Sequence, residues 1–231
     1  MNEYWKGLSS TIGTKFLVAL TGVVLVAFVV GHMLGNLQVY LGPEAINSYA
    51  VLLKSKPGLL WAARLGLLAA LIVHICGIAR LSLRNQDARP DSYAMKKPVA
   101  SSFSSRTMVL SGAGLLAFIV YHLLHFTAGA TNPEHFRLID ELGRHDVYSM
   151  MVLGFQRPAV AISYILAMGI LGLHLGHGIA SIFHSMGWSR PKTAPMIELA
   201  GRLAALILVI GNISIPIAAL LGWIEPTQGA L

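Results

Sequence analysis

Apolar residues fill five long stretches of this chain, and polar residues gather between them. The stretches cover approximately residues 15–35, 59–83, 107–128, 158–183 and 203–223. An α-helix rises about 1.5 Å per residue, so about 20 apolar residues span a hydrocarbon core of about 30 Å. The pattern predicts an all-α membrane protein, with five transmembrane helices in one bundle and a single membrane domain over 1–231.

Composition agrees with this prediction. Of the 231 residues, 55% are hydrophobic and only 12% are charged, and the mean hydropathy is +0.66. The first apolar stretch follows Lys6 and Lys15, but it is longer than a signal-peptide core and lacks a clear cleavage site, so we expect it to stay in the mature protein. The only cysteine, Cys76, excludes an intrachain disulfide and a cysteine-ligated cluster held by this chain alone.

The distribution of basic residues predicts the orientation in the membrane. One side of the predicted bundle carries eleven, namely Lys6, Lys15, Arg80, Arg84, Arg89, Lys96, Lys97, Arg106, Arg190, Lys192 and Arg202. The other side carries six, namely Lys54, Lys56, Arg64, Arg137, Arg144 and Arg157. Because Lys and Arg concentrate on the cytoplasmic side, we expect the N-terminus inside and the C-terminus outside. The net charge of +7 then reflects topology, and no nucleic-acid partner is expected.

The connections predict smaller elements. Pro43 and the pair Pro57-Gly58 bound a short interfacial helix within 41–56, and an amphipathic helix is expected around 134–142. Residues 85–105 form a polar, basic inner connection that faces a partner or lipid headgroups, and 188–195 form a tight inner loop.

Four of the five stretches carry a histidine at nearly the same distance from their start. The intervals are 17 residues from Lys15 to His32 and from Pro57 to His74, and 16 residues from Arg106 to His122 and from Pro158 to His174. Because successive helices run in opposite directions, this offset of roughly 25 Å puts His32 and His122 near the outer face. It puts His74 and His174 near the inner face. The spacing predicts two histidine pairs at two depths.

Paired imidazoles from facing helices supply the two axial ligands of a b-type haem, so two pairs predict two haems, roughly 15 to 20 Å apart. Glycines at those levels would leave room for a flat macrocycle, or would serve close helix packing. His125 and His177 each follow a predicted ligand by three residues and are alternative ligands. A membrane histidine can also be an interhelical hydrogen-bond partner or a proton relay. His135, His145 and His184 are expected to be solvated or interfacial.

Several segments resemble one family, the five-helix dihaem cytochrome b subunit of succinate:quinone oxidoreductases, which include succinate dehydrogenases and quinol:fumarate reductases. The segments are AFVVGHMLGN around His32, GPEAINSYA after it, LIVHICGIARLSLRNQDARPDSY around His74, LLAFIVYHLLHF around His122 and LGLHLGHGIASIFHSMGW around His174. Their order and spacing cover nearly the whole chain.

The resemblance implies His32, His74, His122 and His174 as haem ligands, paired His32 with His122 and His74 with His174. It excludes His125 and His177 as ligands. It also implies two partners, a flavoprotein with covalent FAD that interconverts succinate and fumarate, and an iron–sulfur protein. This chain would hold no catalytic residue of that reaction. It would act as the anchor and quinone-reactive subunit in a prokaryotic cytoplasmic membrane, with menaquinone as the expected quinone.

The resemblance places quinone chemistry near the outer haem, and proton exchange there needs hydrogen-bonding groups. The candidates are Glu44, Asn47, Tyr49, Arg64 and His125. Haem propionates would suit Lys15, Ser105 or Arg106. Some family members carry a glutamate two residues before the fourth ligand to help carry protons, but this chain has Gly172 there.

Two other functions fit the histidines. A haem-free transporter or proton channel would use them as a relay and would be colourless. A free-standing dihaem quinol-linked ferrireductase would be red but would need no flavoprotein or iron–sulfur partner. The transporter is less favoured, because the histidines form two layers away from the midplane, where transporter sites lie.

Overall fold

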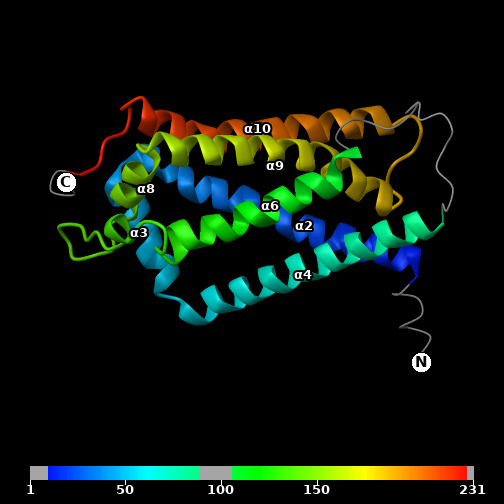
Figure 1. Ribbon diagram of the computed structural model, residues 1–231, viewed down its shortest axis with the longest axis horizontal. Coiled ribbons are helices and arrows are strands. Elements are labelled where there is room, and N and C mark those ends of the chain that lie inside the picture. Colours follow the sequence, from blue (N-terminus) through cyan, green and yellow to red (C-terminus); the bar gives the residue numbers. More distant parts are fainter. Residues whose placement is uncertain (1–9, 89–105, 228–231) are drawn as a thin grey trace.

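The computed structural model describes residues 10–88 and 106–227 (Figure 1). The elements, in order, are α2 (Thr11–Asn36), η1 (Leu37–Leu41), α3 (Pro43–Lys54), α4 (Pro57–Asp87), α6 (Met108–His122), the π-helical turn η2 (Leu123–Thr127), α7 (Pro133–Phe136), α8 (Val147–Phe155), α9 (Pro158–Ser185) and α10 (Ala194–Leu220). Within these two ranges the chain is helical, with one isolated bridge between Ile139 and His145 and no strand.

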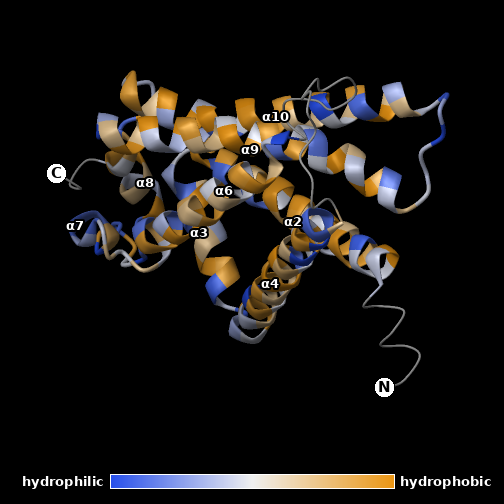
Figure 2. Ribbon diagram, turned by 45° about the vertical axis from the view of Figure 1, so that its right-hand side comes forward, coloured by the Kyte–Doolittle hydropathy of each residue, from blue (hydrophilic) through white to orange (hydrophobic). Residues whose placement is uncertain are grey.

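Five helical segments are long and apolar enough to cross a membrane, as the hydropathy pattern predicts. They are Thr11–Leu41, Pro57–Asp87, Met108–Thr127, Pro158–Ser185 and Ala194–Leu220. Many apolar side chains lie on their outer surfaces, and no residue of α4 is buried (Figure 2). Such continuous apolar surface is typical of helices that face lipid.

The long helices pack unevenly. α9 and α10 lie side by side along most of their length, α6 packs on α9, and α2 lies between α9 and α4 (Figure 1). α4 packs chiefly against α2. Among the described helices, neither α2 and α6 nor α4 and α9 pack closely against each other.

The two ends of the bundle differ. At one end, η1, α3, α7, α8 and residues 221–227 cover the helices, and we call this the capped end (Figure 1). Most of the buried core lies there, built from α8, α9 and α10 around Val152, Tyr164 and Ala218. The other end, where α2, α6 and α10 begin, is the open end.

Two local features differ from the sequence prediction. The short helix within 41–56 is present as α3, but the helix expected over 134–142 is only the single turn α7. The carboxylate of Asp140 accepts the backbone N–H groups of Leu142 and Arg144, at 3.1 and 2.8 Å, so a turn takes the place of helix at the end of the predicted range. α8, which is almost wholly buried, was not predicted, and its N-cap is Asp146, whose carboxylate accepts the N–H of Ser149 at 3.0 Å.

The last transmembrane helix also differs from its predicted bounds of 203–223. α10 begins nine residues earlier, at Ala194, and ends at Leu220. Its first turns contain Glu198 and Arg202, an i,i+4 ion pair at 3.0 Å. The pair supports helix in a segment that hydropathy alone assigns to the loop.

Candidate cofactor site

His32 and His122 face each other across the bundle. Their rings, from α2 and α6, lie with centres 5.6 Å apart and planes at 85°. Phe28 stacks on His32 at 5.3 Å, and Phe118 lies 5.9 Å from His122. The two histidines predicted for the same level are therefore brought together near the capped end.

His74 and His174 form the second group, nearer the open end. His74 lies on α4 and His174 on α9. His74 Nδ1 lies 3.2 Å from the backbone oxygen of Val18 and 3.2 Å from the hydroxyl of Thr21, both on α2. His174 Nδ1 lies 3.1 Å from the hydroxyl of Ser111 on α6. Each ring is thus held by a neighbouring helix.

These hydrogen bonds select a tautomer. The Val18 carbonyl can only accept, so His74 donates from Nδ1. The Ser111 hydroxyl donates to the Met108 carbonyl at 3.0 Å, so it accepts from His174 Nδ1. A neutral imidazole protonated at Nδ1 offers its Nε2 lone pair to a metal, and such a second hydrogen bond is usual for metal-bound histidines.

Glycines lie next to the second pair. A Cβ added at Gly22 would come within 3.6 Å of His74 Cε1, and one at Gly112 within 3.5 Å of His174 Cε1. Near His32, a Cβ at Gly31 would meet nothing within 4 Å. The chain therefore leaves room beside the rings where larger side chains would intrude.

Other glycines serve helix packing instead. A Cβ at Gly77 would lie 2.5 Å from Val18 Cγ2, and one at Gly172 would lie 2.8 Å from Val209 Cγ2. The position where some members of the resembling family carry a glutamate is therefore occupied here by the close contact of α9 with α10. Close helix packing, one of the two roles that the sequence left open for glycine, is therefore shown at Gly77 and Gly172, while room for a macrocycle stays a prediction.

The arrangement fits a bis-histidine haem. The rings of His32 and His122, with centres 5.6 Å apart, are close enough for one nitrogen of each to approach a shared metal, whose bonds to imidazole are about 2 Å long. The His32/His122 pair also joins two helices that do not pack closely on each other, α2 and α6. His32 Nε2 lies 3.2 Å from Asn36 Nδ2, a contact that iron would replace.

A pocket opens beside His32 at the capped end. It has a volume of about 170 Å³ and is lined by His32, Gly35 and Asn36 of α2, by Ile46, Tyr49, Ala50 and Leu53 of α3, and by Val147 of α8. Tyr49 lies over Gly35, where an added Cβ would come within 2.9 Å of the Tyr49 ring. The pocket combines apolar walls with the polar groups of Tyr49 and Asn36, as small-molecule sites commonly do.

Of the five residues predicted for quinone binding, only Tyr49 lines this pocket. Glu44 and Asn47 lie on α3 but bond to the loop before α8. Arg64 lies on exposed α4, with its guanidinium 5.1 Å from the Trp61 ring centre. His125 is 2% exposed and bonds to Tyr164.

A polar network joins α3 to the loop before α8 and to the start of α8. Arg144 contacts Glu44 at 2.7 Å and Asp140 at 2.7 Å, and its bond to Glu44 lowers the pKa of that carboxyl to about 2. Buried Asn47 donates to Asp146 at 3.1 Å and accepts from the Tyr148 N–H at 3.0 Å. Burial opposes ionisation of Asp146, but bonds from Ser149, Asn47 and Thr227 outweigh it and lower the pKa of the group.

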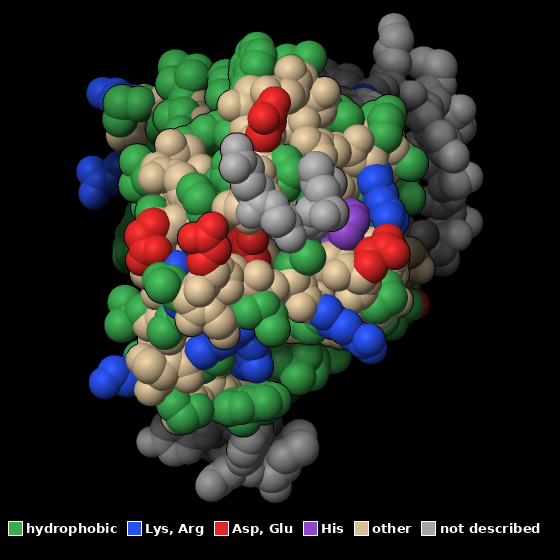
Figure 3. Space-filling model, turned by 90° about the vertical axis from the view of Figure 1, so that its left-hand side faces the viewer, with side chains coloured by type: hydrophobic (Ala, Val, Ile, Leu, Met, Phe, Trp, Pro, Cys, Tyr) green, Lys and Arg blue, Asp and Glu red, His purple; other side chains and the backbone are tan. Residues whose placement is uncertain are grey.

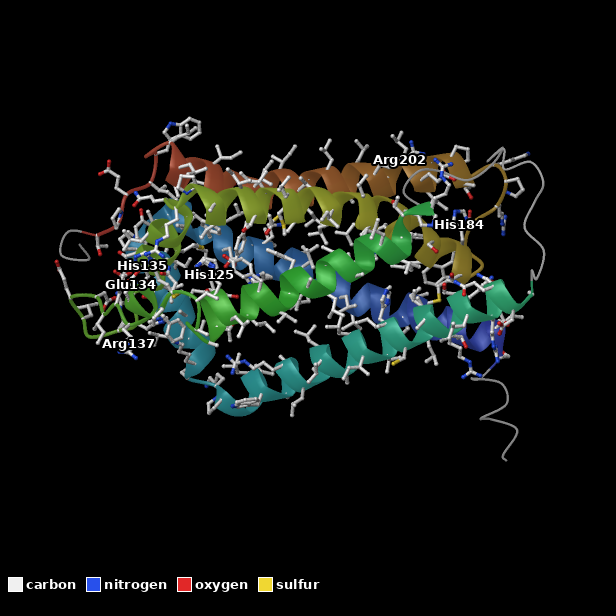
Figure 4. All side chains as sticks on the ribbon, in the orientation of Figure 1. His125, Glu134, His135, Arg137, His184 and Arg202 are labelled. Carbon is white, nitrogen blue, oxygen red and sulfur yellow. The ribbon has the colours of Figure 1, made fainter. Side chains whose placement is uncertain are left out.

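Acidic and basic side chains are scattered among hydrophobic and other groups on the surface of the capped end (Figure 3). Arg157 pairs with Glu134, and His135 Nδ1 lies 2.7 Å from Asn132 Nδ2. Burial, followed by Arg157, lowers the pKa of His135. His135 and Glu134 lie close to buried His125, whereas His184 and Arg202 lie at the open end (Figure 4).

The residues predicted for propionates lie at the open end where the structure describes them. Lys15 is exposed on the first turns of α2, and Arg106 is exposed just before α6. Ser105 lies outside the described residues.

Sequence reasoning missed several residues of this site, including Val18, Thr21 and Ser111, which hold the second histidine pair. Asn36 follows His32 by four residues, one helical turn, and that spacing could have indicated it. Gly22 and Tyr164 have no such signal, because only the packing of α2 on α4 and of α9 on α6 brings them to the histidines.

Comparisons of the chain with protein-family models, with curated proteins and with solved structures found no match. The family resemblance read from the sequence therefore stays a prediction, and the site has to be interpreted from its own geometry.

Proposed function

We propose that this chain is the membrane-anchor cytochrome b subunit of a succinate:quinone oxidoreductase, with His32/His122 and His74/His174 as the axial ligands of two haems b. The observation that carries the proposal is the meeting of His32 and His122 across helices that do not pack closely on each other, together with the holding of His74 and His174 by Val18 and Ser111 at a second level. When bound, the haems would supply one-electron carriers at two depths of the bilayer.

The residues of the chain have separate roles in this proposal. Val18 and Ser111 hold His74 and His174 in the tautomer that presents Nε2. Both pairs lie on helices that are apolar enough to span a membrane, and Gly22 and Gly112 keep space beside the second pair. A low-polarity site of this kind helps to set the reduction potential of a haem.

We assign the pocket beside His32 to a membrane quinone, with menaquinone as the expected type. A quinone ring suits the apolar walls, and its carbonyl oxygens can accept from the Tyr49 hydroxyl or the Asn36 amide. Quinone reduction takes up protons, and the pocket lies at the capped end, next to the polar network. From the distribution of Lys and Arg we expect that end to lie outside.

In the assembled complex, the open end would face the cytoplasm and bind the iron–sulfur subunit, which in turn carries the flavoprotein with covalent FAD. Lys15, Arg106 and Arg202 give this end a basic surface. The family resemblance covers both succinate oxidation and fumarate reduction.

Purification of the tagged chain from native membranes tests the assignment. We expect it to bring down a subunit with acid-stable flavin fluorescence and a second with iron–sulfur EPR signals, and succinate to reduce the bound haem. A red protein that purifies alone and reduces ferric chelates with quinol would favour the ferrireductase. A colourless protein would favour the histidine-relay transporter.

A further inference from the structure

The hydroxyl of Tyr164 lies between two histidines. Tyr164, on α9, is buried among the rings of Phe118, Phe126 and Phe155, at centre distances of 4.9, 5.7 and 4.9 Å. Its oxygen lies 3.2 Å from Nδ1 of His122 and 3.0 Å from Nδ1 of His125. In this apolar surrounding, the two ring nitrogens are the hydrogen-bond partners of the hydroxyl.

A hydroxyl has one proton, so Tyr164 can donate to only one of the two nitrogens and must accept from the other. If it donated to His122 Nδ1, neutral His122 would carry its proton on Nε2 and could not bind a metal there. If it accepts from His122, Nε2 of His122 is free, and the tyrosine proton goes to His125 Nδ1. The second arrangement matches His74 and His174, which both donate from Nδ1.

The residues around His125 pack closely against its imidazole ring. It is 2% exposed, and Tyr121 stacks on it at 5.6 Å and 18°. A Cβ added at Gly154 would come within 3.5 Å of its Cε1 and Nε2. The π-helical turn Leu123–Thr127, with the Ala128 N–H bonded to the Leu123 carbonyl at 2.8 Å, begins directly after His122. π-Helical turns are rare, and those inside α-helices often occur at functional sites.

We propose that Tyr164 and His125 are positioning residues for His122. The hydrogen-bond chain runs from His122 Nδ1–H to the Tyr164 oxygen, and from the Tyr164 hydroxyl to His125 Nδ1. It fixes the tautomer that presents His122 Nε2 and strengthens the donation from Nδ1, because each bond in such a chain polarises the next. This role rests on the proposed function, and it removes His125 from the residues expected to contact the quinone.

A stronger hydrogen bond from Nδ1 makes the imidazole more electron-donating, which favours ferric iron and lowers the reduction potential. Tyr164→Phe keeps the ring and removes the hydroxyl, so the midpoint potential of one haem rises and that of the other stays unchanged. His125→Leu removes the acceptor and shifts the same haem in the same direction by a smaller amount. His125→Asn has a similar shape to His125→Leu but places a carbonyl oxygen near the Nδ1 position, and it restores the wild-type potential.

The test is potentiometric titration of both haems in the complete membrane complex, for wild type and these three variants. His177→Leu is the matched control, because His177 follows His174 by the same three residues, and it leaves both potentials unchanged. If the Tyr164→Phe variant loses its haem, its potential cannot be measured. The potentials of His125→Leu and His125→Asn, which both keep the tyrosine, then test the proposal. Equal potentials in His125→Leu, His125→Asn and wild type would overturn the inference while leaving a dihaem protein. A wild type without haem would overturn the proposed function itself.

Discussion

The imidazole rings of His32 and His122 meet at 5.6 Å and at nearly a right angle, although the helices that carry them, α2 and α6, do not pack closely on each other. α2 packs on α4 and α9, and α6 packs on α9. Two imidazoles thus approach each other between membrane-spanning helices, where polar side chains are rare and often functional. Iron bound between them would take the place of the His32–Asn36 contact, and we therefore interpret this pair as a candidate binding site.

Filling the space beside His174 should remove one cofactor only. We expect Gly112→Leu to displace the His174 ring, because even a Cβ there lies 3.5 Å from Cε1. The haem-to-protein ratio should fall from about two to about one. Gly66→Leu is the control, since a Cβ at Gly66 meets nothing within 4 Å. Two retained haems in Gly112→Leu would mean that this side of His174 does not face the cofactor.

Tyr49→Phe should weaken quinone binding without changing the fold. The hydroxyl lost from the pocket supplies one hydrogen bond, and a bond worth about 1 kcal/mol corresponds to a KM increase of roughly fivefold to tenfold. Haem content and thermal stability should match the wild type. Tyr40→Phe serves as the control, because Tyr40 is exposed and outside the pocket. An unchanged quinone KM would exclude Tyr49 as a quinone contact.

Asn47→Ala should lower stability and leave quinone kinetics intact. The change removes bonds to Asp146 and to the Tyr148 N–H, and buried groups left without partners cost about 1–3 kcal/mol each. Thermal unfolding in detergent should show a lower Tm, while exposed Gln156→Ala should not. A raised quinone KM at an unchanged Tm would instead make Asn47 part of the quinone site.

The Arg144–Glu44 pair should make thermal stability depend on pH in the acid range. Arg144, followed by Ser48, lowers the Glu44 pKa to about 2 from an ordinary value of 4.5. Because the folded-state pKa is the lower one, the stabilisation is fully present above pH 4.5 and is lost as the pH falls toward 2. The Tm difference between wild type and Glu44→Gln should be constant from pH 8 to 5 and shrink below pH 4.5. A difference that shrinks between pH 8 and 6 would point to another group.

The sequence was enough to predict the five long helices and the levels of their histidines. Both follow from length. A helix rises by a fixed distance per residue, so the number of residues from Lys15 to His32 gives the depth of His32 in a membrane of known thickness. The structure describes the five helices and places His32 beside His122, but it leaves the orientation and the ligand roles as predictions.

The capped end was harder to predict. The segment Val147–Phe155 is apolar but too short to cross a bilayer, so hydropathy gave no element there, and its burial comes from contacts with α9 and α10. No feature of the local sequence indicates the π-helical turn after His122. Tyr164 reaches His122 and His125 only through tertiary packing, which neither periodicity nor spacing encodes.

The central claim is that two histidine pairs each hold a haem, and absorption spectroscopy tests it most directly. The measurement is a dithionite-reduced minus oxidised spectrum with pyridine haemochrome quantitation per chain, for wild type and for alanine variants of His32, His74, His122, His125, His174 and His177. We predict about two haems b in wild type, loss of haem in the variants of His32, His74, His122 and His174, and retention of both haems at His125 and His177. A wild-type chain without haem, purified from haem-replete cells, would contradict the account.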